Sequence, residues 1–396
     1  MADTNPEKIK EVLERGVEKI YPSKDALQAI LRSGKKIRLY CGYDPSAPTL
    51  HLGHAITLRK LGQFQKMGHE VIMLIGDFTG MIGDPTDKSA TRKKLTRAEV
   101  LNNAKNYKRF ASAFLDFIGR NAARIEYNSK WNDKLTFPDL IELSSYVTVQ
   151  QLITRDMFQE RLKKNQPIHF HEFLYPLAQG YDSVAMDVDL EIGGNDQTFN
   201  MLVGRDLLKI LKHKEKFVLA MKLLTDPSGK KMGKSEGNMV QMDDAPNEMF
   251  GKIMSWPDPQ ILPAFELLTG VSEKELKEIS KKLKNKNTNP RDLKIQLAEV
   301  ITAFYYDAEQ AKKAAQEFNR VFRKKELPAE LPMFTLKGTL PLLDLLVKTK
   351  LAASKSEAKR LIEQGAVKID SEIQKDWRRI ISLRRGMVLQ AGKRKF

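Results

Sequence analysis

The chain has 396 residues, 41% of them hydrophobic, so it is long enough for two or three domains with substantial cores. No apolar run is long enough to cross a bilayer, and the single cysteine, Cys41, excludes an intrachain disulfide and a thiolate zinc site. The net charge of +17 favours a polyanionic partner, with nucleic acid ahead of a membrane surface.

The N-terminal segment predicts two capped helices. Asn5 and Pro6 begin a helix that we expect to run to about Tyr21, and Ser23 begins a second helix that Gly34 ends. The first sixteen residues are charged and amphipathic, without the apolar core of a signal peptide or the Arg-rich character of a transit peptide. This composition predicts a cytoplasmic protein.

The next segments alternate between strands and helices. A strand over 37–41, a helix over 55–67 and a buried strand over 71–75 predict a βαβ unit with parallel strands. Further strands are expected over 124–127, 188–192 and 217–224, and further helices over 96–118, 137–153, 172–181 and 194–211. The alternation predicts an α/β fold with a doubly wound parallel sheet that ends near residue 224.

The remainder of the chain changes character. Segments 247–256, 272–283 and 290–323 are poor in glycine and periodic, which predicts a helical domain. Pro328 and Pro332 indicate a linker. The tail combines short helices over 342–346 and 356–363 with a stop at Gly365 and short strands around Val367 and Met387. We therefore predict domains over 1–224, 225–325 and 337–396, with a linker over 326–336.

His51 and His54 flank a glycine at the start of the helix predicted over 55–67, in the sequence YCGYDPSAPTLHLGH (40–54). Free N–H groups and the helix dipole favour phosphate at such a terminus, and Gly53 would let a nucleotide approach the backbone between His51 and His54. Taken alone, this short motif fits an ordinary helix start with two hydrogen-bonded histidines equally well.

A second candidate phosphate site is the lysine loop, which we define as DPSGKKMGKSEGN (226–238). Its glycines and proline exclude a helix or strand, and Lys230, Lys231 and Lys234 supply charge that can move onto a polyphosphate. Taken alone, this loop is more often an exposed basic turn than a phosphate site. Both candidate sites, however, follow strands of one predicted parallel sheet, and open α/β sheets bind ligands at the carboxyl ends of their strands.

Three polar residues on one predicted helix suggest a small-molecule pocket. Tyr175, Gln179 and Asp182 are spaced by four and three residues, so their side chains share one helix face. Buried polar groups are costly unless paired, which favours a binding face over a core face. A polar surface stripe is the alternative.

These motifs resemble known signatures. HLGH and KMGKS resemble the HIGH and KMSKS signatures of class I aminoacyl-tRNA synthetases, with Gly233 in place of a serine. Tyr40, the run TGMIGDP (79–85), the polar helix face and the GGNDQ turn (193–197) resemble tyrosyl-tRNA synthetases. The resemblance covers nearly the whole chain. It implies a Rossmann-like catalytic domain, an α-helical anticodon-recognition domain and a small α+β S4-like RNA-binding domain.

The resemblance also implies a role for each matching residue. Tyr40 and Asp182 would hold the phenolic hydroxyl of tyrosine, which phenylalanine would leave unpaired; this enzyme family is the standard example of such rejection. The other expected tyrosine-binding residues are Asp84, Tyr175, Gln179 and Gln197. The expected ATP-binding residues are Gly42, Asp44, Ser46, His51, Gly53, His54, Gly194, Asp196, Lys231 and Lys234. His51, His54, Lys231 and Lys234 would be catalytic.

The implied reaction needs no protein nucleophile and no general base. The ionised carboxylate of tyrosine would attack the α-phosphorus of ATP while pyrophosphate leaves, so catalysis consists of positioning and charge stabilisation. Mg²⁺ would accompany ATP without a metal cage built by the protein. The terminal ribose of tRNA(Tyr) would then attack the adenylate, and the resemblance adds a homodimer.

The tail sequence SKSEAKRLIEQGAVKID (354–370) resembles an S4-type RNA-binding domain. Lys355, Lys359 and Arg360 lie about one helical turn apart, which suits contact with phosphates. Fifteen basic residues against six acidic ones place +9 of the net charge in residues 337–396. A solvated charged face is the alternative.

Two departures and two alternative functions complete the sequence-based hypothesis. Ser46 stands where the family often has threonine, and Thr198 where many members have tryptophan, a pattern closer to a second bacterial subgroup. A tryptophan–tRNA ligase is disfavoured because an indole N–H only donates, whereas Tyr40 and Asp182 suit a phenol. A non-catalytic RNA-binding scaffold would not need the phosphate and tyrosine motifs.

Overall fold

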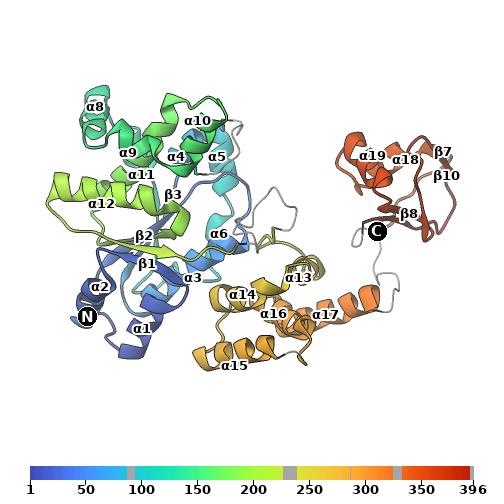
Figure 1. Ribbon diagram of the computed structural model, residues 1–396, viewed down its shortest axis with the longest axis horizontal. Coiled ribbons are helices and arrows are strands. Elements are labelled where there is room, and N and C mark those ends of the chain that lie inside the picture. The colour runs from blue at the N-terminus through green and yellow to red at the C-terminus, as the bar shows by residue number, and fades with distance from the viewer. Residues whose placement is uncertain (87–93, 226–238, 286, 324–331, 393–396) are drawn as a thin grey trace.

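The computed structural model describes residues 1–86, 94–225, 239–285, 287–323 and 332–392 (Figure 1). The lysine loop, with Lys231 and Lys234, and most of the predicted linker lie outside the described residues.

A six-stranded sheet in the order β1-β6-β5-β2-β3-β4 forms the centre of the N-terminal part (Figure 1). Its strands are β1 (Val17–Tyr21), β2 (Arg38–Tyr43), β3 (Glu70–Ile75), β4 (Arg124–Tyr127), β5 (Leu190–Gly194) and β6 (Phe217–Met221). All neighbouring pairs from β6 to β4 are parallel. The chain first winds outward from β2 to β4 and then returns to β5 beside β2, so the strand order reverses between β2 and β5. The predicted doubly wound α/β fold is confirmed.

The first predicted helix is wrong in its second half. Helix α1 (Pro6–Glu14) is capped by Asn5, as expected, but the chain then turns at Gly16, whose φ is +66°. Residues 17–21 form β1, which pairs antiparallel with β6 at the edge of the sheet. The helix ends before Gly16 because a positive φ is not helical. Glycine adopts this φ readily because it has no side chain. Helix α2 (Lys24–Arg32) is capped by Ser23, as predicted.

Helices cover both faces of the sheet. Alternation along β2 directs Leu39, Cys41 and Tyr43 into the core shared with α3 (Leu52–Lys66), whereas Tyr40 packs with Met186 and Val188 at the other face. That face carries α11 (Phe170–Met186) and α12 (Thr198–Lys212). These two helices approach closely at Gly180, where an added Cβ would lie 3.1 Å from the Gly204 nitrogen.

Two of the predicted long helices are broken in the structure. The segment 96–118 forms α5 (Arg97–Ala104) and α6 (Tyr107–Ala111). Asn103 donates to the Pro45 carbonyl and Tyr107 to the Ala47 carbonyl, so each helix is joined separately to the loop after β2. The segment 137–153 forms two helices because Thr148 caps a new one. The remaining helices of this part are α4 (Thr79–Ile82), α7 (Ser129–Asn132), α8 (Phe137–Ser145), α9 (Val149–Ile153) and α10 (Asp156–Lys163), with a 3-10 turn, η1 (Asn195–Gln197).

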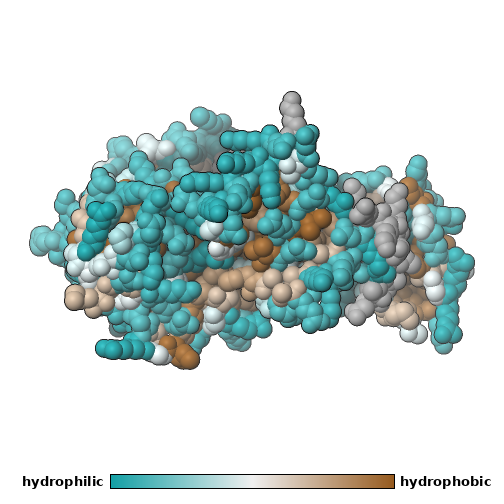
Figure 2. Space-filling view, turned by 90° about the horizontal axis from the view of Figure 1, so that it is seen from below, coloured by the Kyte–Doolittle hydropathy of each residue, from teal (hydrophilic) through white to brown (hydrophobic). Residues whose placement is uncertain are grey.

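A helical region follows the sheet, as predicted. It contains α13 (Pro246–Met254), η3 (Asp258–Gln260), α14 (Ile261–Leu268), α15 (Glu273–Lys284), α16 (Pro290–Tyr305) and α17 (Ala308–Arg323). The face of the molecule seen in Figure 2 is mostly hydrophilic, with hydrophobic residues gathered near its middle.

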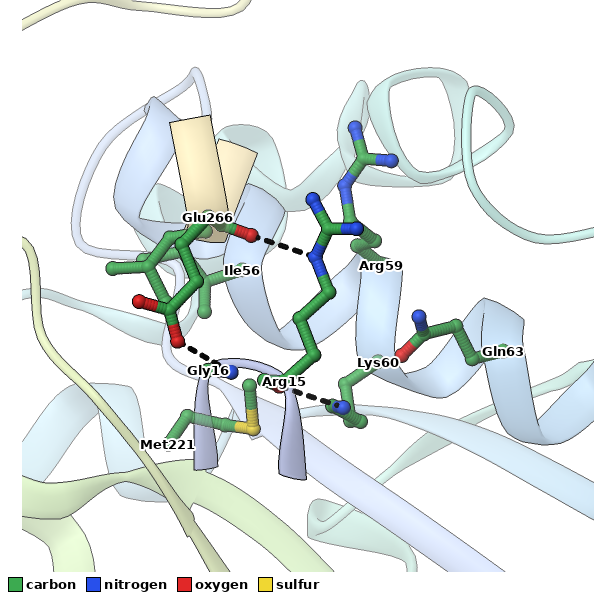
Figure 3. Close-up of a pocket in the computed structure, with 9 residues that line it drawn as sticks. Arg15, Gly16, Ile56, Arg59, Lys60, Gln63, Met221 and Glu266 are labelled. Atoms are coloured by element: carbon green, nitrogen blue, oxygen red, sulfur yellow. Dashed lines mark hydrogen bonds between the residues drawn. The ribbon is translucent and has the colours of Figure 1, made fainter. Parts of the chain in front are cut away.

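Helix α14 is joined to the N-terminal part around a small hollow (Figure 3). There the Arg15 guanidinium donates to the Glu266 carbonyl at 3.0 Å, and the Glu266 carboxylate accepts from the Gly16 nitrogen at 3.0 Å. Lys60 of α3 donates to the Arg15 carbonyl at 3.0 Å. The lining of this hollow includes none of the predicted site residues. The hydrogen bonds of Arg15 and Arg59 to carbonyls of α14 join that helix to the end of α1 and to α3.

The C-terminal part has its own small core and is α+β, as predicted. Leu342, Leu346, Ile362 and Val367 are buried together in it. Its elements are β7 (Thr339–Pro341), α18 (Leu342–Lys348), α19 (Lys355–Glu363), β8 (Val367–Ile369), β9 (Glu372–Ile373), β10 (Ile380–Ser382) and β11 (Leu389–Ala391). The strands form one two-stranded and one three-stranded sheet.

Candidate active site

The predicted pocket residues meet where the strand order reverses. Tyr40 and Gly42 lie on β2, with Asp44 and the exposed Ser46 in the loop that follows it. Gly194 ends β5, and Asp196 and Gln197 lie in η1 directly after it. Tyr175, Gln179 and Asp182 come from α11, which packs over this end of the sheet. Residues distant in sequence therefore surround one point at the carboxyl ends of β2 and β5.

Tyr40 and Asp182 are both buried, and each has its own hydrogen-bond partners. The Tyr40 hydroxyl lies 2.9 Å from Ser183 Oγ. Asp182 accepts from Trp131 Nε1 at 2.7 Å and from the amides of Asn132 and Asn128, each at 3.2 Å. Burial raises the pKa of Asp182, while the bonds from Trp131 and the asparagines oppose that rise because they favour the carboxylate. Among the described residues, the three groups that are hydrogen-bonded to Asp182 are all N–H donors, an arrangement that suits an ionised acceptor.

Asp44 joins the ATP side of the predicted site to the tyrosine side. Its carboxylate accepts from the Tyr175 hydroxyl at 2.8 Å and from Thr79 Oγ1 at 2.6 Å. Gly76, at the end of β3, makes room for it, since an added Cβ would lie 1.9 Å from Asp44 Oδ1. Only glycine fits there.

Asp84 and Gln197 are paired directly. Gln197 Nε2 donates to Asp84 Oδ2 at 2.6 Å, and Thr86 donates to Oδ1 through its hydroxyl at 2.6 Å and its nitrogen at 2.9 Å. Burial raises the pKa of Asp84, and the bonds from Thr86 and Gln197 oppose that rise. Arg155 donates to the Thr86 hydroxyl at 3.0 Å.

The two histidines of HLGH lie against each other at the start of α3. His51 Nδ1 accepts from the Gly53 nitrogen, and His54 Nδ1 accepts from the His51 nitrogen, both at 3.1 Å. Their ring centroids are 3.9 Å apart. A Cβ at Gly53 would lie 2.8 Å from His51 Cε1, so this glycine lets the two rings adopt their positions. The geometry places both imidazoles at the positive end of a 15-residue helix.

The backbone that follows the lysine loop is paired with the HLGH segment. The Leu52 nitrogen donates to the Val240 carbonyl at 3.0 Å, and the Met242 nitrogen donates to the Leu50 carbonyl at 2.9 Å. The last described residue before the loop, Thr225, follows β6. The flank after the loop is thus hydrogen-bonded to the segment that carries HLGH, and the flank before it follows β6, which pairs with β5.

The three predicted RNA-binding residues lie on α19 and are exposed. Lys355 forms an ion pair with Asp344 at 2.5 Å, and Lys359 lies over the Trp377 ring at 4.7 Å from its centroid. Arg360 is on the same helix. This arrangement presents a basic helical face to solvent.

Comparisons with known proteins identify the family. The family model "tRNA synthetases class I (W and Y)" matches residues 32–323, and "Tyrosine--tRNA ligase SYY-like C-terminal domain" matches residues 324–396. The tyrosine–tRNA ligase of Moorella thermoacetica is 47% identical over 97% of this chain and 94% of its own length. That of Thermotoga maritima is 45% identical over 99% of this chain and 97% of its own length.

The chain belongs to the tyrosyl-tRNA synthetase family. It is therefore a class I aminoacyl-tRNA synthetase that uses ATP and joins tyrosine to tRNA, as the motifs predicted. The tryptophan-specific alternative is not supported.

Solved structures of tyrosyl-tRNA synthetases have the same fold. The Archaeoglobus fulgidus enzyme complexed with L-tyrosine aligns with a TM-score of 0.60 and 22% identity, covering 78% of this chain and 99% of that one. The C-terminally truncated mitochondrial enzyme of Aspergillus nidulans aligns with a TM-score of 0.66 and 19% identity, covering 80% and 94%.

Several residues of this synthetase site were not predicted from the sequence. The hydrogen-bond partners Ser183, Trp131 and Asn128 carry no motif of their own. A buried ion pair between Glu191 of β5 and Lys216, directly before β6, also escaped prediction. A signal did exist for this pair, because a charge inside or beside an otherwise apolar central strand is unusual unless it is paired.

Proposed function

We propose that the pocket between β2, β5 and α11 binds L-tyrosine and ATP and catalyses formation of tyrosyl-adenylate. The observation that carries this proposal is the convergence of Tyr175, Gln179 and Asp182 from one helix face with Tyr40 and Asp44 from the end of β2. A polar surface stripe would not be buried in this way.

Tyrosine would be recognised at both ends of the molecule. Tyr40 and Asp182 would hold its phenolic hydroxyl, with Asp182 as the acceptor. Asp84, Tyr175 and Gln179 would surround its ammonium group, and Gln197 would lie near its carboxylate. The hydrogen bond from Gln197 to Asp84 supports this proposal, because it holds Gln197 beside one of the residues proposed for the ammonium group.

ATP would lie across the starts of α3 and η1. Gly53, His51 and His54 would face its phosphates at the N-terminus of α3, where pyrophosphate leaves. Gly42, Asp44 and Ser46 would line the reaction cleft. Gly194 and Asp196 would contact the ribose, and their closeness supports this, since an added Cβ at Gly194 would lie 2.4 Å from Asp196 Oδ1. The roles of Lys231 and Lys234 in ATP binding and catalysis stay a prediction.

The protein's own contribution to the reaction is positioning and charge. The tyrosine carboxylate is already ionised, so it attacks the α-phosphorus in line without a general base. Within the described residues, no group of three His, Cys, Asp or Glu side chains is placed to hold a metal ion. The Mg²⁺ that would accompany the nucleotide stays a prediction.

A second copy of the chain is the partner we propose for an exposed apolar surface on α8, α9 and the start of α11. Its large hydrophobic residues include Phe137 and Phe170, which are 75% and 74% exposed, together with Ile141 and Val149. Exposed apolar side chains of this size are typical of protein interfaces. They support the predicted homodimer.

The basic tail would contact tRNA(Tyr). Lys355, Lys359 and Arg360 supply positive charge on one exposed helix, which suits phosphate contacts along an RNA backbone.

None of the helices in the described part of the chain combines the length and apolar character that a bilayer crossing requires. The cytoplasmic location stays a prediction.

Pyrophosphate exchange into ATP, measured with each amino acid in turn, tests the proposed function. We expect tyrosine to drive exchange far better than any other amino acid, and we expect His54→Asn to remove most of the tyrosine-dependent exchange. His213→Asn, at the end of α12, is a matched control that should keep the activity. Exchange driven by tryptophan, or by no amino acid, would contradict the proposal.

A further inference from the structure

A buried ion pair lies beneath the proposed tyrosine pocket. The side chains of Lys216 and Glu191 are 0% and 3% exposed, and they are hydrogen-bonded to each other. Gly204 of α12 makes room for the lysine, because an added Cβ there would lie 2.8 Å from Lys216 Nζ. Burying two charges costs desolvation energy, and well-packed apolar residues often stabilise a protein equally well. Stability alone does not explain this pair.

Glu191 orients the amide of Gln179. Gln179 Nε2 donates to Glu191 Oε1 at 3.2 Å. A carboxylate only accepts hydrogen bonds, so the amide nitrogen must face Glu191 and the amide oxygen must face away from it. That oxygen is buried and has no hydrogen-bond partner among the described residues. An acceptor left in this state calls for a donor from a ligand.

The same ion pair reaches Tyr40 through Ser183. Lys216 Nζ donates to Ser183 Oγ at 2.8 Å, and Ser183 Oγ in turn lies 3.4 Å from Glu191 Oε2. An ammonium group only donates, so it occupies one lone pair of the serine oxygen. When the serine proton is directed to the carboxylate, the second lone pair is left for the Tyr40 hydroxyl, 2.9 Å away.

We propose that Glu191 and Lys216 are positioning residues for tyrosine. They turn the amide oxygen of Gln179 toward the α-ammonium group of the substrate and, through Ser183, hold the hydroxyl of Tyr40 in place. The inference rests on the proposed function of this pocket and adds to it the groups that set the polarity of its walls. Neither residue contacts the substrate itself.

The test compares two ligands that differ only in the ammonium group. L-tyrosine and 3-(4-hydroxyphenyl)propionate are bound to the wild-type chain and to Glu191→Gln, and the ratio of their dissociation constants is measured. A glutamine at position 191 both donates and accepts, so it no longer dictates the orientation of the Gln179 amide. We expect the preference for tyrosine to fall about tenfold, the size of one hydrogen bond to a charged group. The KM for ATP in pyrophosphate exchange should change less than about twofold, because no ATP contact is altered.

Two further variants keep the test decisive. Lys214→Met removes the neighbouring ion pairs with Asp187 and Asp189, at 3.2 Å each, which do not contact the pocket residues. It should keep the wild-type ligand ratio. If Glu191→Gln does not fold with its lysine unpaired, the double variant Glu191→Gln/Lys216→Met buries no charge and is measured in its place.

The possible outcomes separate this inference from the proposed function. A wild-type chain without tyrosine-dependent exchange would contradict the proposed function. If the wild-type chain is active but the variants keep its ligand ratio, only the role of Glu191 and Lys216 is overturned. The same holds if the variants weaken the binding of both ligands and of ATP equally. A reduced ratio with an unchanged KM for ATP supports it.

Discussion

Replacing Asp182 by asparagine tests the recognition of the phenol. The change keeps the shape of the side chain and removes its charge. Every described neighbour that bonds to this carboxylate donates an N–H: Trp131 at 2.7 Å, and Asn128 and Asn132 at 3.2 Å. The new NH₂ group must therefore face at least one other donor. Asn128 has little freedom to turn, because its amide oxygen accepts from the Phe78 nitrogen at 2.9 Å.

The magnitude follows from these contacts. One buried donor left without an acceptor costs about 1–3 kcal/mol of unfolding free energy. A hydrogen bond from the substrate hydroxyl to a charged acceptor contributes about 1.5–3 kcal/mol, so we expect the KM for tyrosine to rise roughly 10- to 150-fold. Phenylalanine has no hydroxyl to lose, and its use should change little.

Pyrophosphate exchange measures both effects in one assay, with tyrosine and phenylalanine as alternative substrates. The KM for ATP should stay within about twofold, because Asp182 belongs to the proposed tyrosine side of the site and not to the proposed ATP side. Asp187→Asn is the matched control, since it makes the same change at the left-handed C-cap of the same helix, at a φ of 50° that asparagine tolerates. Equal losses with tyrosine and phenylalanine would refute the assignment of Asp182 to the hydroxyl.

Three other variants probe other parts of the chain. Gly53→Ala pushes a methyl group to 2.8 Å from the His51 ring, so kcat for exchange should fall roughly 10- to 100-fold with little change in the KM for tyrosine; an unchanged kcat would remove this terminus from catalysis. Burial lowers the pKa of His69 from 6.5 to about 4. Between these values the unfolded chain binds a proton that the folded chain does not, so the free energy of unfolding should fall as the pH drops, by about 3 kcal/mol in total. In denaturant titrations at pH 7 and 4.5, the free energy of unfolding of His69→Gln should lack this fall. An equal fall in the variant and the wild-type chain would contradict the prediction. Arg360→Gln should weaken tRNA binding and reduce the salt slope by about one, and an unchanged slope would exclude a phosphate contact.

Local signals in the sequence determined much of this fold. Ser23 caps the second helix, and the run over 71–75 forms a strand. The spacing of Tyr175, Gln179 and Asp182 places all three on one face of α11, where Tyr175 and Asp182 are buried and Gln179 is half-buried. Such features depend on neighbours within about one helical turn or one strand, so periodicity and cap residues report them directly.

Other features depended on packing between distant segments. Residues 17–21 become a strand because β6 offers them an edge, although they continue a helical pattern along the chain. Trp131 and Asn128 reach Asp182 from the end of β4, and Lys216 meets Glu191 from the neighbouring strand. The sequence by itself thus predicted which residues would carry the chemistry, and it determined most of the helices and strands that present them. Only the tertiary structure decided how their polar atoms are paired, because a hydrogen bond between residues 25 to 143 positions apart depends on which elements pack together, and no local pattern records that.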